Sequence, residues 1–279
     1  MRPSIVAYLD VLGFKQQVRA SHDAGASDTL LQRFATVIRE WYTSLRGQPA
    51  DEPGWELKAF TDNVVLGHPI RWDDGEAELT AVLSDVALLQ IGLAQEGFFV
   101  RGGIAAGDLY VDEDIVFGIG LLDAVEAEQR ANTPRVVLSE SAIRLVKQHL
   151  ECYASVATSP QNRQLLFDED NQLVVNYLDC SWPVHTEAPL FGWLAKHRDV
   201  LVDRLAQHRA EPHVWAKYAW VARYHNYFCN SIPDGMPHRV DVSLPPLEPK
   251  QLQDVIRKKR RLDKRLQPTA EKKRTGGRG

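Results

Sequence analysis

Cysteine is scarce in this sequence, and long uncharged apolar runs are missing. The three cysteines are Cys152, Cys180 and Cys229, and no two of them have CxxC spacing. This count and spacing argue against a disulfide framework and a cysteine zinc site. No stretch reaches the ~18 uncharged apolar residues of a membrane span. The first apolar run carries Asp10 in its middle, unlike a secretory signal, so the sequence predicts a cytosolic protein without a membrane span.

Charge is distributed unevenly along the chain. Residues 250–279 contain 12 Lys or Arg and three Asp or Glu. Residues 1–249 contain 21 Lys or Arg and 34 Asp or Glu. An acidic body therefore carries a basic tail. A solvated terminus is the favoured interpretation of this tail, and binding of nucleic acid or an anionic membrane is the alternative. Hydrophobic residues make up 44% of the chain, which is enough for a core of ordinary size.

Hydrophobic periodicity predicts alternating strands and helices in the first half of the chain. The predicted strands are 4–12, 98–106, 109–116 and 135–138, together with a hairpin over 56–66 that turns at Asp62-Asn63. The predicted helices are 28–46, 79–93, 119–131 and 139–149. The order β-α-β-β-α-β is that of a ferredoxin-like unit, so we expect an α+β fold.

The second half predicts shorter strands and then helices. Strands are predicted around 151–156, 163–167 and 172–178, followed by helices over 188–208 and 212–229. The last helix is rich in aromatic residues, which we interpret as core packing or a dimer contact rather than a surface that stacks on bases.

Two aspartates are candidate metal ligands. Asp10 lies inside an apolar strand, where a carboxylate is costly unless it is paired or bound to a cation. Asp62 lies on the central hairpin, whose strands neighbour the first strand in a ferredoxin-like sheet. Two close carboxylates repel unless cations lie between them, and Mg²⁺ or Mn²⁺ fits oxygen ligands and phosphate chemistry. The alternatives are an Asp10 bonded to backbone groups or an arginine, and an Asp62 that only makes a turn.

Five short motifs, in matching order and spacing, resemble those of class III nucleotidyl cyclases. They are YLDVLGF at 8–14, FTDN at 60–63, RGGIAAG at 101–107, VFG at 116–118 and PRVVLSESA at 134–142. The resemblance covers about residues 4–147. The stretch over 117–139 is most similar to the pyrimidine cyclases of Pycsar antiphage systems, and residues 217–226 also resemble that branch.

The resemblance implies a metal and phosphate site. Asp10, Asp62 and the backbone carbonyl of Val11 are the implied ligands of Mn²⁺ or Mg²⁺, with two ions expected. The backbone N–H groups of Gly13 and Phe14 follow the first strand, and they are implied to bind the β- and γ-phosphates.

Four further positions bear on the substrate. Lys58 occupies the base-reading position of purine cyclases, and a solvated strand lysine is its alternative. Arg101 either neutralises phosphate charge or braces the sheet through an acid. Leu122 and Glu126 stand where purine cyclases have the Asn and Arg that steady the transition state. Neither residue can replace those groups.

The function implied is conversion of UTP to 3′,5′-cyclic UMP and pyrophosphate, a second messenger in bacterial antiphage defence. The resemblance also implies a homodimer with its active sites at the interface, and a separate effector that responds to the product. CTP or ATP as the substrate remains open, and Lys58 favours ATP. A catalytically silent module that binds nucleotides or nucleic acid is the alternative from another class. We expect a cyclase-like domain over 1–185, a helical extension over 186–232, and a loop with a disordered basic tail over 233–279.

Overall fold

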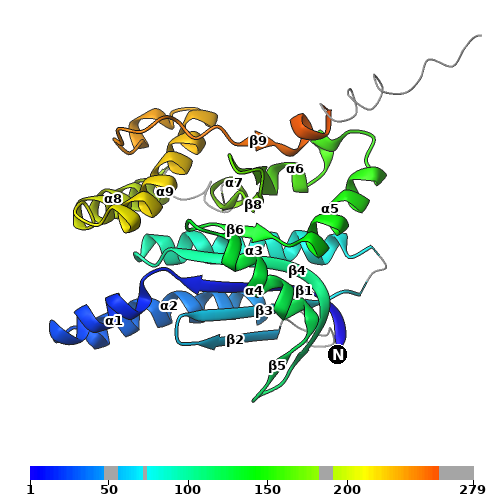
Figure 1. The fold of residues 1–279 in the computed structure, drawn as a ribbon, viewed down its shortest axis with the longest axis horizontal. Coiled ribbons are helices and arrows are strands. Elements are labelled where there is room, and N and C mark those ends of the chain that lie inside the picture. The colour runs from blue at the N-terminus through cyan, green and yellow to red at the C-terminus, as the bar shows by residue number, and fades with distance from the viewer. Residues whose placement is uncertain (47–55, 72–73, 182–190, 258–279) are drawn as a thin grey trace, which may run out of the picture.

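The structure is a computed structural model that describes residues 1–46, 56–71, 74–181 and 191–257. Within these ranges the strands form one mixed sheet in the order β2-β3-β1-β4-β6-β8-β7-β9, and β5 pairs with β4 (Figure 1). The strands are β1 Arg2–Val11, β2 Glu56–Phe60, β3 Asn63–Pro69, β4 Val100–Val111, β5 Val116–Phe117, β6 Val136–Leu138, β7 Leu165–Phe167, β8 Leu173–Val175 and β9 Lys250–Gln251. The helices are α1 Phe14–Asp23, α2 Ser27–Arg46, α3 Glu76–Gln95, α4 Ile119–Arg130, α5 Glu140–Cys152, α6 Gln161–Gln164, α7 Tyr177–Ser181, α8 Gly192–Gln207 and α9 Pro212–Ser231.

The first part of the sheet has the predicted β-α-β-β-α-β topology. Strands β2, β3, β1 and β4 are neighbours in that order, and each adjacent pair is antiparallel. Helix α2 connects β1 to β2, and α3 connects β3 to β4, which is the connectivity of a ferredoxin-like unit. The α+β fold is therefore confirmed. Strand β6 then adds to β4 in parallel, and the remaining strands extend the sheet on that side.

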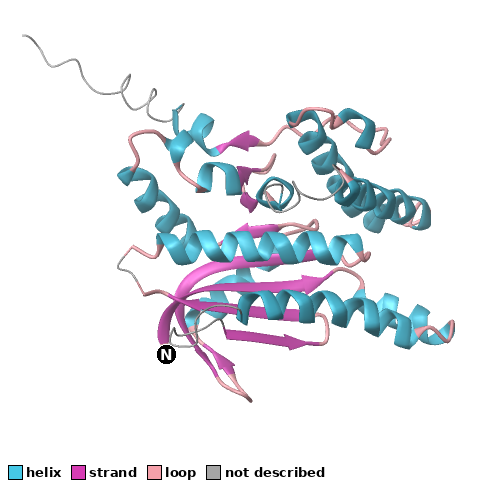
Figure 2. Ribbon diagram, turned by 180° about the vertical axis from the view of Figure 1, so that it is seen from behind, coloured by secondary structure: helices cyan, strands magenta, loops and turns pink. Residues whose placement is uncertain are grey.

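The main core lies between the sheet and the two long helices α2 and α3, which cover one face of it (Figure 2). Ile5, Ala7 and Leu9 alternate along β1 and share a buried cluster with Val82 and Val86 of α3. Because successive strand residues point to opposite faces, Tyr8 and Asp10 belong to the other face. The alternation of β1 thus separates its packing residues from its polar ones.

Helix α3 is the one described helix that is long and apolar enough to cross a membrane by length and composition. Leu79, Leu83 and Leu89 are fully buried in the core, and the helix also contacts α7 and α8. Such burial is typical of the central helix of a folded domain, so packing against the sheet accounts for its apolar composition.

Helix α4 lies against the opposite face of β1 and β4, at the front in Figure 1. Its close approach depends on Gly103, because a Cβ there would lie 2.0 Å from the carbonyl oxygen of Ala124 and 2.7 Å from the Cβ of Ala127. This contact fixes the last turn of α4 beside β4, and it brings Glu128 next to the strand that carries Arg101.

Helices α7, α8 and α9 are joined by a buried chain of hydrogen bonds. His225 Nε2 lies 2.8 Å from the carbonyl oxygen of His238, His197 Nδ1 lies 2.9 Å from His225 Nδ1, and Tyr177 Oη lies 3.0 Å from His197 Nε2. Because a carbonyl only accepts, His225 carries its hydrogen on Nε2, and each ring nitrogen then has a fixed role. Burial lowers the pKa of His225 to about 4, so the chain is neutral at pH 7.

Helix α1, the turn between β2 and β3, and the β4–β5 segment differ from the sequence-based expectation. The chain forms α1 directly after β1, whereas the first predicted helix begins at residue 28. The turn of the first hairpin is Thr61-Asp62, one residue earlier than Asp62-Asn63, because Phe60 pairs with Asn63. Residues 109–116 are not one strand, since 109–111 end β4 and the chain turns before β5.

Two expectations for the second half of the chain are also corrected. Residues 151–156 form the end of α5 and a loop instead of a strand. Residues 250–251 were expected in a disordered tail, but they pair with β7 as β9. Leu252 follows in a short helix over 252–257 and is buried, and this burial explains why the segment is ordered. The predicted start of a helix at 188–190 and most of the basic tail lie outside the described residues.

Replacing Gly103 with Ala should lower the free energy of unfolding by about 1–3 kcal/mol, because α4 must shift to accept the Cβ. Gly92→Ala is the matched control. Gly92 lies within α3, and its Cβ would meet only the Cγ1 methyl of Val37, at 3.2 Å. Urea unfolding measures both variants, and equal losses would contradict the described contact of α4 with β4.

Candidate active site

The candidate site begins with a row of side chains across the sheet. Asp10 of β1 lies in register between Asn63 of β3 and Arg101 of β4. Tyr8 lies two residues before Asp10 on β1, in register between Val65 of β3 and Gly103 of β4. Residues that pair directly across strands share a face of the sheet, so Asp10, Asn63, Arg101 and Tyr8 lie on the face that α4 partly covers.

Asp10 is neutralised by an arginine. Arg101 Nη2 lies 2.9 Å from Asp10 Oδ2 and 2.8 Å from Oε1 of Glu128. The side chains of Asp10 and Arg101 are 23% and 27% exposed, and that of Glu128 is 8% exposed. Burial raises the pKa of Glu128, the charge of Arg101 opposes this, and the charge of Asp10 adds to it. Arg101 thus contacts two acids in this structure, and its role in neutralising phosphate charge stays a prediction.

Asp62 is held in the two-residue loop between β2 and β3. Its Oδ1 accepts a hydrogen bond from Asn63 Nδ2 at 3.2 Å. Thr61 Oγ1 lies 2.7 Å from both this oxygen and the carbonyl oxygen of Phe60. The backbone oxygen of Asp62 accepts the N–H of Val11 at 3.0 Å. Thr61 has a φ of 53°, which is the left-handed backbone that the first position of such a tight hairpin loop adopts. The loop thus attaches directly to the end of β1.

Tyr8 is joined to the loop of Asp62 through Asn63. Its hydroxyl hydrogen bonds to Oδ1 of Asn63. The pKa of Tyr8 is raised by burial and then by the charges of Asp10, Glu128 and Asp62, with Arg101 opposing. Both aspartates therefore act on the same phenol. Three carboxyl groups and one guanidinium act on this phenol, so their formal charges sum to an excess of negative charge.

These groups fit a divalent cation. Among the described residues, Oδ1 of Asp10 and Oδ2 of Asp62 receive no protein hydrogen bond, so each aspartate has one oxygen available. The N–H of Val11 faces the hairpin loop, and the carbonyl of the same residue in an extended strand faces the same way. In the described ranges no group of three or more His, Cys, Asp or Glu side chains forms a metal centre. Mg²⁺ is commonly bound by one or two carboxylates together with substrate phosphates, and that is the arrangement these residues offer.

Gly13 and Phe14 form the connection from β1 to α1. Gly13 is exposed and has a φ of 68°, and α1 begins after it without a side-chain cap. The ring of Phe14 packs against Phe34 and Phe98, at centroid distances of 5.2 and 6.3 Å. This packing anchors the first turn of α1. The N-terminal N–H groups of this helix follow the strand of Asp10 and have no cap to satisfy them.

Lys58 is engaged by the β4–β5 hairpin. It pairs in register with Val65, beside Tyr8, and its Nζ donates to the carbonyl oxygen of Glu113 at 2.5 Å. Leu122 and Glu126 are exposed on α4. Neither makes a described contact with the Asp10 cluster, which is the group Tyr8, Asp10, Asp62, Asn63, Arg101 and Glu128.

The pattern of motifs did not identify Tyr8, Asn63 or Glu128 as site residues. Tyr8 and Asn63 both lie inside the quoted motifs, two residues before Asp10 and one after Asp62. Their position beside the two candidate aspartates was the signal that could have identified them. Glu128 carried no such signal, because its contact with Arg101 depends on where α4 packs.

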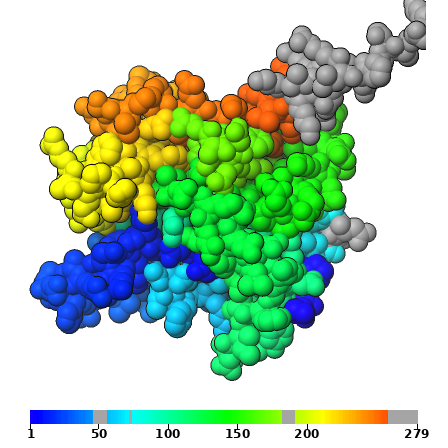
Figure 3. All heavy atoms as spheres, viewed as in Figure 1, coloured from blue at the N-terminus to red at the C-terminus, as the bar shows by residue number. Residues whose placement is uncertain are grey.

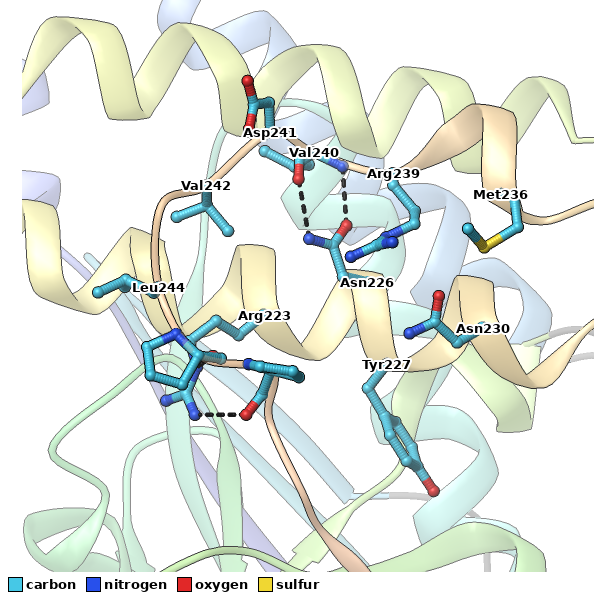
Figure 4. A pocket seen from close by; sticks show the side chains of 12 residues that line it. Arg223, Asn226, Tyr227, Asn230, Met236, Arg239, Val240, Asp241, Val242 and Leu244 are labelled. Atoms are coloured by element: carbon cyan, nitrogen blue, oxygen red, sulfur yellow. Dashed lines mark hydrogen bonds between the residues drawn. The ribbon is translucent and has the colours of Figure 1, made fainter.

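A separate pocket of about 370 Å³ lies between α9 and the loop that follows it (Figure 4). Asn226 brackets the backbone of Val240 with two hydrogen bonds of 2.8 Å, and Arg223 donates to the carbonyl of Pro245 at 2.6 Å. These contacts hold the loop over the helix. None of the residues that line the pocket belongs to the Asp10 cluster.

Comparison with known proteins gives structural similarities alone. No family model matches this sequence, and no curated protein sequence matches it. A class III adenylyl cyclase-like ATP-binding protein from Pseudomonas aeruginosa is similar over 66% of this chain, with 13% identity and a TM-score of 0.43. The chain spans 40% of that protein. The adenylyl cyclase CyaB of P. aeruginosa is similar over 53% of this chain and 82% of its own, with 11% identity and a TM-score of 0.40.

Replacing Arg101 with Met should destabilise the fold by about 2 kcal/mol at pH 7, because Asp10 and Glu128 would then be left as close, unneutralised carboxylates. The loss should shrink at pH 4, where carboxylates take up protons, and adding Glu128→Gln should restore part of the stability. Arg2→Met is the control, since Arg2 makes an exposed ion pair with Glu56 that is worth less than ~1 kcal/mol. Urea unfolding at both pH values measures these effects, and an equal loss at pH 4 and pH 7 would contradict this description of the charge cluster.

Proposed function

We propose that this chain is a metal-dependent nucleotidyl cyclase that converts UTP to 3′,5′-cyclic UMP and pyrophosphate. The observation that carries the proposal is that Asp10 pairs in register with Asn63, the neighbour of Asp62, and that the loop of Asp62 is hydrogen bonded to Val11, the neighbour of Asp10. Each aspartate has an available carboxylate oxygen. The excess negative charge of this cluster suits divalent cations, and the uncapped start of α1 suits phosphates. The motifs that resemble class III cyclases, with their pyrimidine-cyclase features, supply the reaction and the choice of UTP.

The reaction is an in-line attack of the ribose 3′-oxygen on the α-phosphorus. The new bond joins O3′ to the α-phosphorus, the bond to the β-phosphate oxygen breaks, pyrophosphate leaves, and the proton of the 3′-hydroxyl passes to solvent. Mn²⁺ or Mg²⁺, when bound, acts as a Lewis acid and screens the phosphate charge. Asp10, Asp62 and the carbonyl of Val11 hold the ions, and the N–H groups of Gly13 and Phe14 bind the β- and γ-phosphates. The nucleophile belongs to the substrate, so the protein contributes positioning and electrostatic stabilisation.

The identity of the base is the finer part of the proposal. UTP is favoured over CTP by the resemblance to the pyrimidine branch. A cytidylate cyclase is the nearest alternative, and an adenylate cyclase is favoured only by Lys58. Because Lys58 donates to the carbonyl of Glu113, it must exchange that bond before it can contact a base. Leu122 and Glu126, in place of the Asn and Arg of purine cyclases, favour the pyrimidine branch or a catalytically silent module that binds nucleotides.

The proposal includes a homodimer with active sites at its interface. Large apolar side chains are exposed around the Asp10 face, on the end of β2, the β4–β5 hairpin and the start of α4. They are Phe60, Tyr110, Ile115, Phe117, Ile119 and Leu122. The hairpin projects from the bottom of the molecule in Figure 3, where a second copy can reach it. An exposed apolar group of this kind is typical of an interaction surface.

The cellular part of the proposal follows from the resemblance to Pycsar systems. The cyclic product would signal to a separate effector protein in the cytoplasm during phage infection. The basic tail, including Arg257, is not assigned a part in the chemistry, and nucleic-acid binding by it remains the alternative role.

Replacing Asp10 or Asp62 with Asn should reduce cyclase activity by ~1,000-fold or more, because loss of one ionised ligand removes several kcal/mol of stabilisation of charge in the transition state. Each of the four nucleoside triphosphates is incubated with the protein and Mn²⁺, and the products are identified by mass spectrometry. Asp199→Asn is the control, since Asp199 pairs with Arg198 on the exposed face of α8. Absence of any cyclic nucleotide from the wild-type protein, or full activity of either variant, would refute the proposal.

The apolar surface gives a second test. Phe117→Glu and Leu122→Glu should convert the dimer to monomer and reduce activity with it, since a charge at the interface loses its hydration on association. Val202→Glu is the control, because Val202 is 47% exposed on α8. Light scattering coupled to size-exclusion chromatography measures the mass. A wild-type monomer, or a dimer that both variants retain, would contradict this part of the proposal.

A further inference from the structure

The hydrogen bonds between Tyr8 and Asp62 have only one consistent direction. An ionised carboxylate accepts hydrogen bonds and cannot donate them, so the group of Asn63 that faces Asp62 must be its NH₂. The carbonyl oxygen of the same amide then faces Tyr8, and the Tyr8 hydroxyl must be the donor. The chain runs from Tyr8 Oη to Asn63 Oδ1, and from Asn63 Nδ2 to Asp62 Oδ1 at 3.2 Å.

This chain determines how the Asp62 carboxylate is turned. Asn63 Nδ2 donates to Oδ1 of Asp62 at 3.2 Å. Thr61 Oγ1 lies 2.7 Å from the same oxygen and 2.7 Å from the carbonyl oxygen of Phe60, so its one hydrogen has two competing acceptors. Oδ2 receives no hydrogen bond from the residues that the structure describes. Asn63 therefore holds one oxygen and leaves the other for a cation. Without Tyr8, the Asn63 amide is free to turn over and to present its carbonyl oxygen to Asp62, which repels the carboxylate.

The chain is not required for the hairpin itself. Phe60 pairs with Asn63 through the backbone, and the N–H of Val11 donates to the backbone oxygen of Asp62 at 3.0 Å. These contacts fix where the loop lies. The side chains of Tyr8 and Asn63 add only the orientation of the carboxylate, which is the role of residues that support metal ligands from outside the coordination shell.

We propose that Tyr8 and Asn63 are positioning residues that orient Asp62 for binding of the divalent cation, an inference that rests on the proposed function. Loss of an outer partner of a metal ligand commonly costs 10–100-fold in metal affinity or activity. We therefore expect Tyr8→Phe to weaken Mn²⁺ binding by about 10-fold. The fold should be retained, because Phe keeps the ring that packs on the sheet.

The experiment measures Mn²⁺ binding to the full chain without nucleotide, using electron paramagnetic resonance to follow free Mn²⁺. Wild type, Tyr8→Phe, Asn63→Leu and the double variant are titrated, with circular dichroism to check the fold. Tyr153→Phe is the matched control, since the Tyr153 hydroxyl donates to Glu76 at 2.8 Å at the start of α3. In parallel, cyclase rates are measured over a range of Mn²⁺ concentrations.

A positioning chain predicts coupling between its two members. Each single variant should raise the Kd for Mn²⁺ by about 10-fold, and the double variant should raise it no further, because either change breaks the same chain. In the cyclase assay the Mn²⁺ requirement should rise by a similar factor, while kcat at saturating Mn²⁺ stays within a few-fold of wild type. Tyr153→Phe should match wild type in both measurements.

Two results would overturn the inference and leave the proposed function standing. One is an unchanged Mn²⁺ affinity in Tyr8→Phe, and the other is a double variant whose losses simply add. A wild-type protein that binds no Mn²⁺ and makes no cyclic nucleotide would remove the proposed function itself, and the inference with it. The two failures are therefore distinguishable in one set of titrations.

Discussion

A carboxylate in an apolar strand is stable only where opposite charge reaches it, and the region around Asp10 is organised by that requirement. Arg101 pairs with Asp10 from the next strand, and the same guanidinium lies beside Glu128 of α4. Asp10 and Glu128 share the single positive charge of Arg101, so their cluster keeps a net negative charge. The charge of Asp62, on the hairpin, adds to it. The fold thus places a negative corner at the end of β1, beside the uncapped start of α1.

Packing in the core positions the strand that carries Tyr8 and Asp10. Alternate residues of β1 bury their side chains under α2 and α3, and this burial fixes the register that presents Tyr8 and Asp10 to the opposite face. Gly103 lets α4 approach β4 closely enough to bring Glu128 to Arg101. The polar residues therefore depend on contacts made by their apolar neighbours, and the candidate site and the core are parts of one arrangement.

Local pattern was enough to predict most of the elements near the site. The apolar run of β1 and the helical periodicity of α2, α3 and α5 are signals within a few residues, and the structure has each of these elements. Other features depend on distant partners. The contact of Arg101 with Glu128 requires α4 to be placed, Lys58 meets a carbonyl on another hairpin, and β9 becomes a strand only because β7 offers a free edge. No single residue distinguishes UTP from CTP in the proposed reaction.

The most direct test of the central claim is the position of bound Mn²⁺. Crystals of the protein with Mn²⁺ and a UTP analogue that cannot cyclise would give an anomalous difference map. The account predicts Mn²⁺ peaks between the carboxylates of Asp10 and Asp62, within coordination distance of both. Full occupancy of the analogue with no Mn²⁺ at these two aspartates, or with their oxygens directed apart, would contradict it.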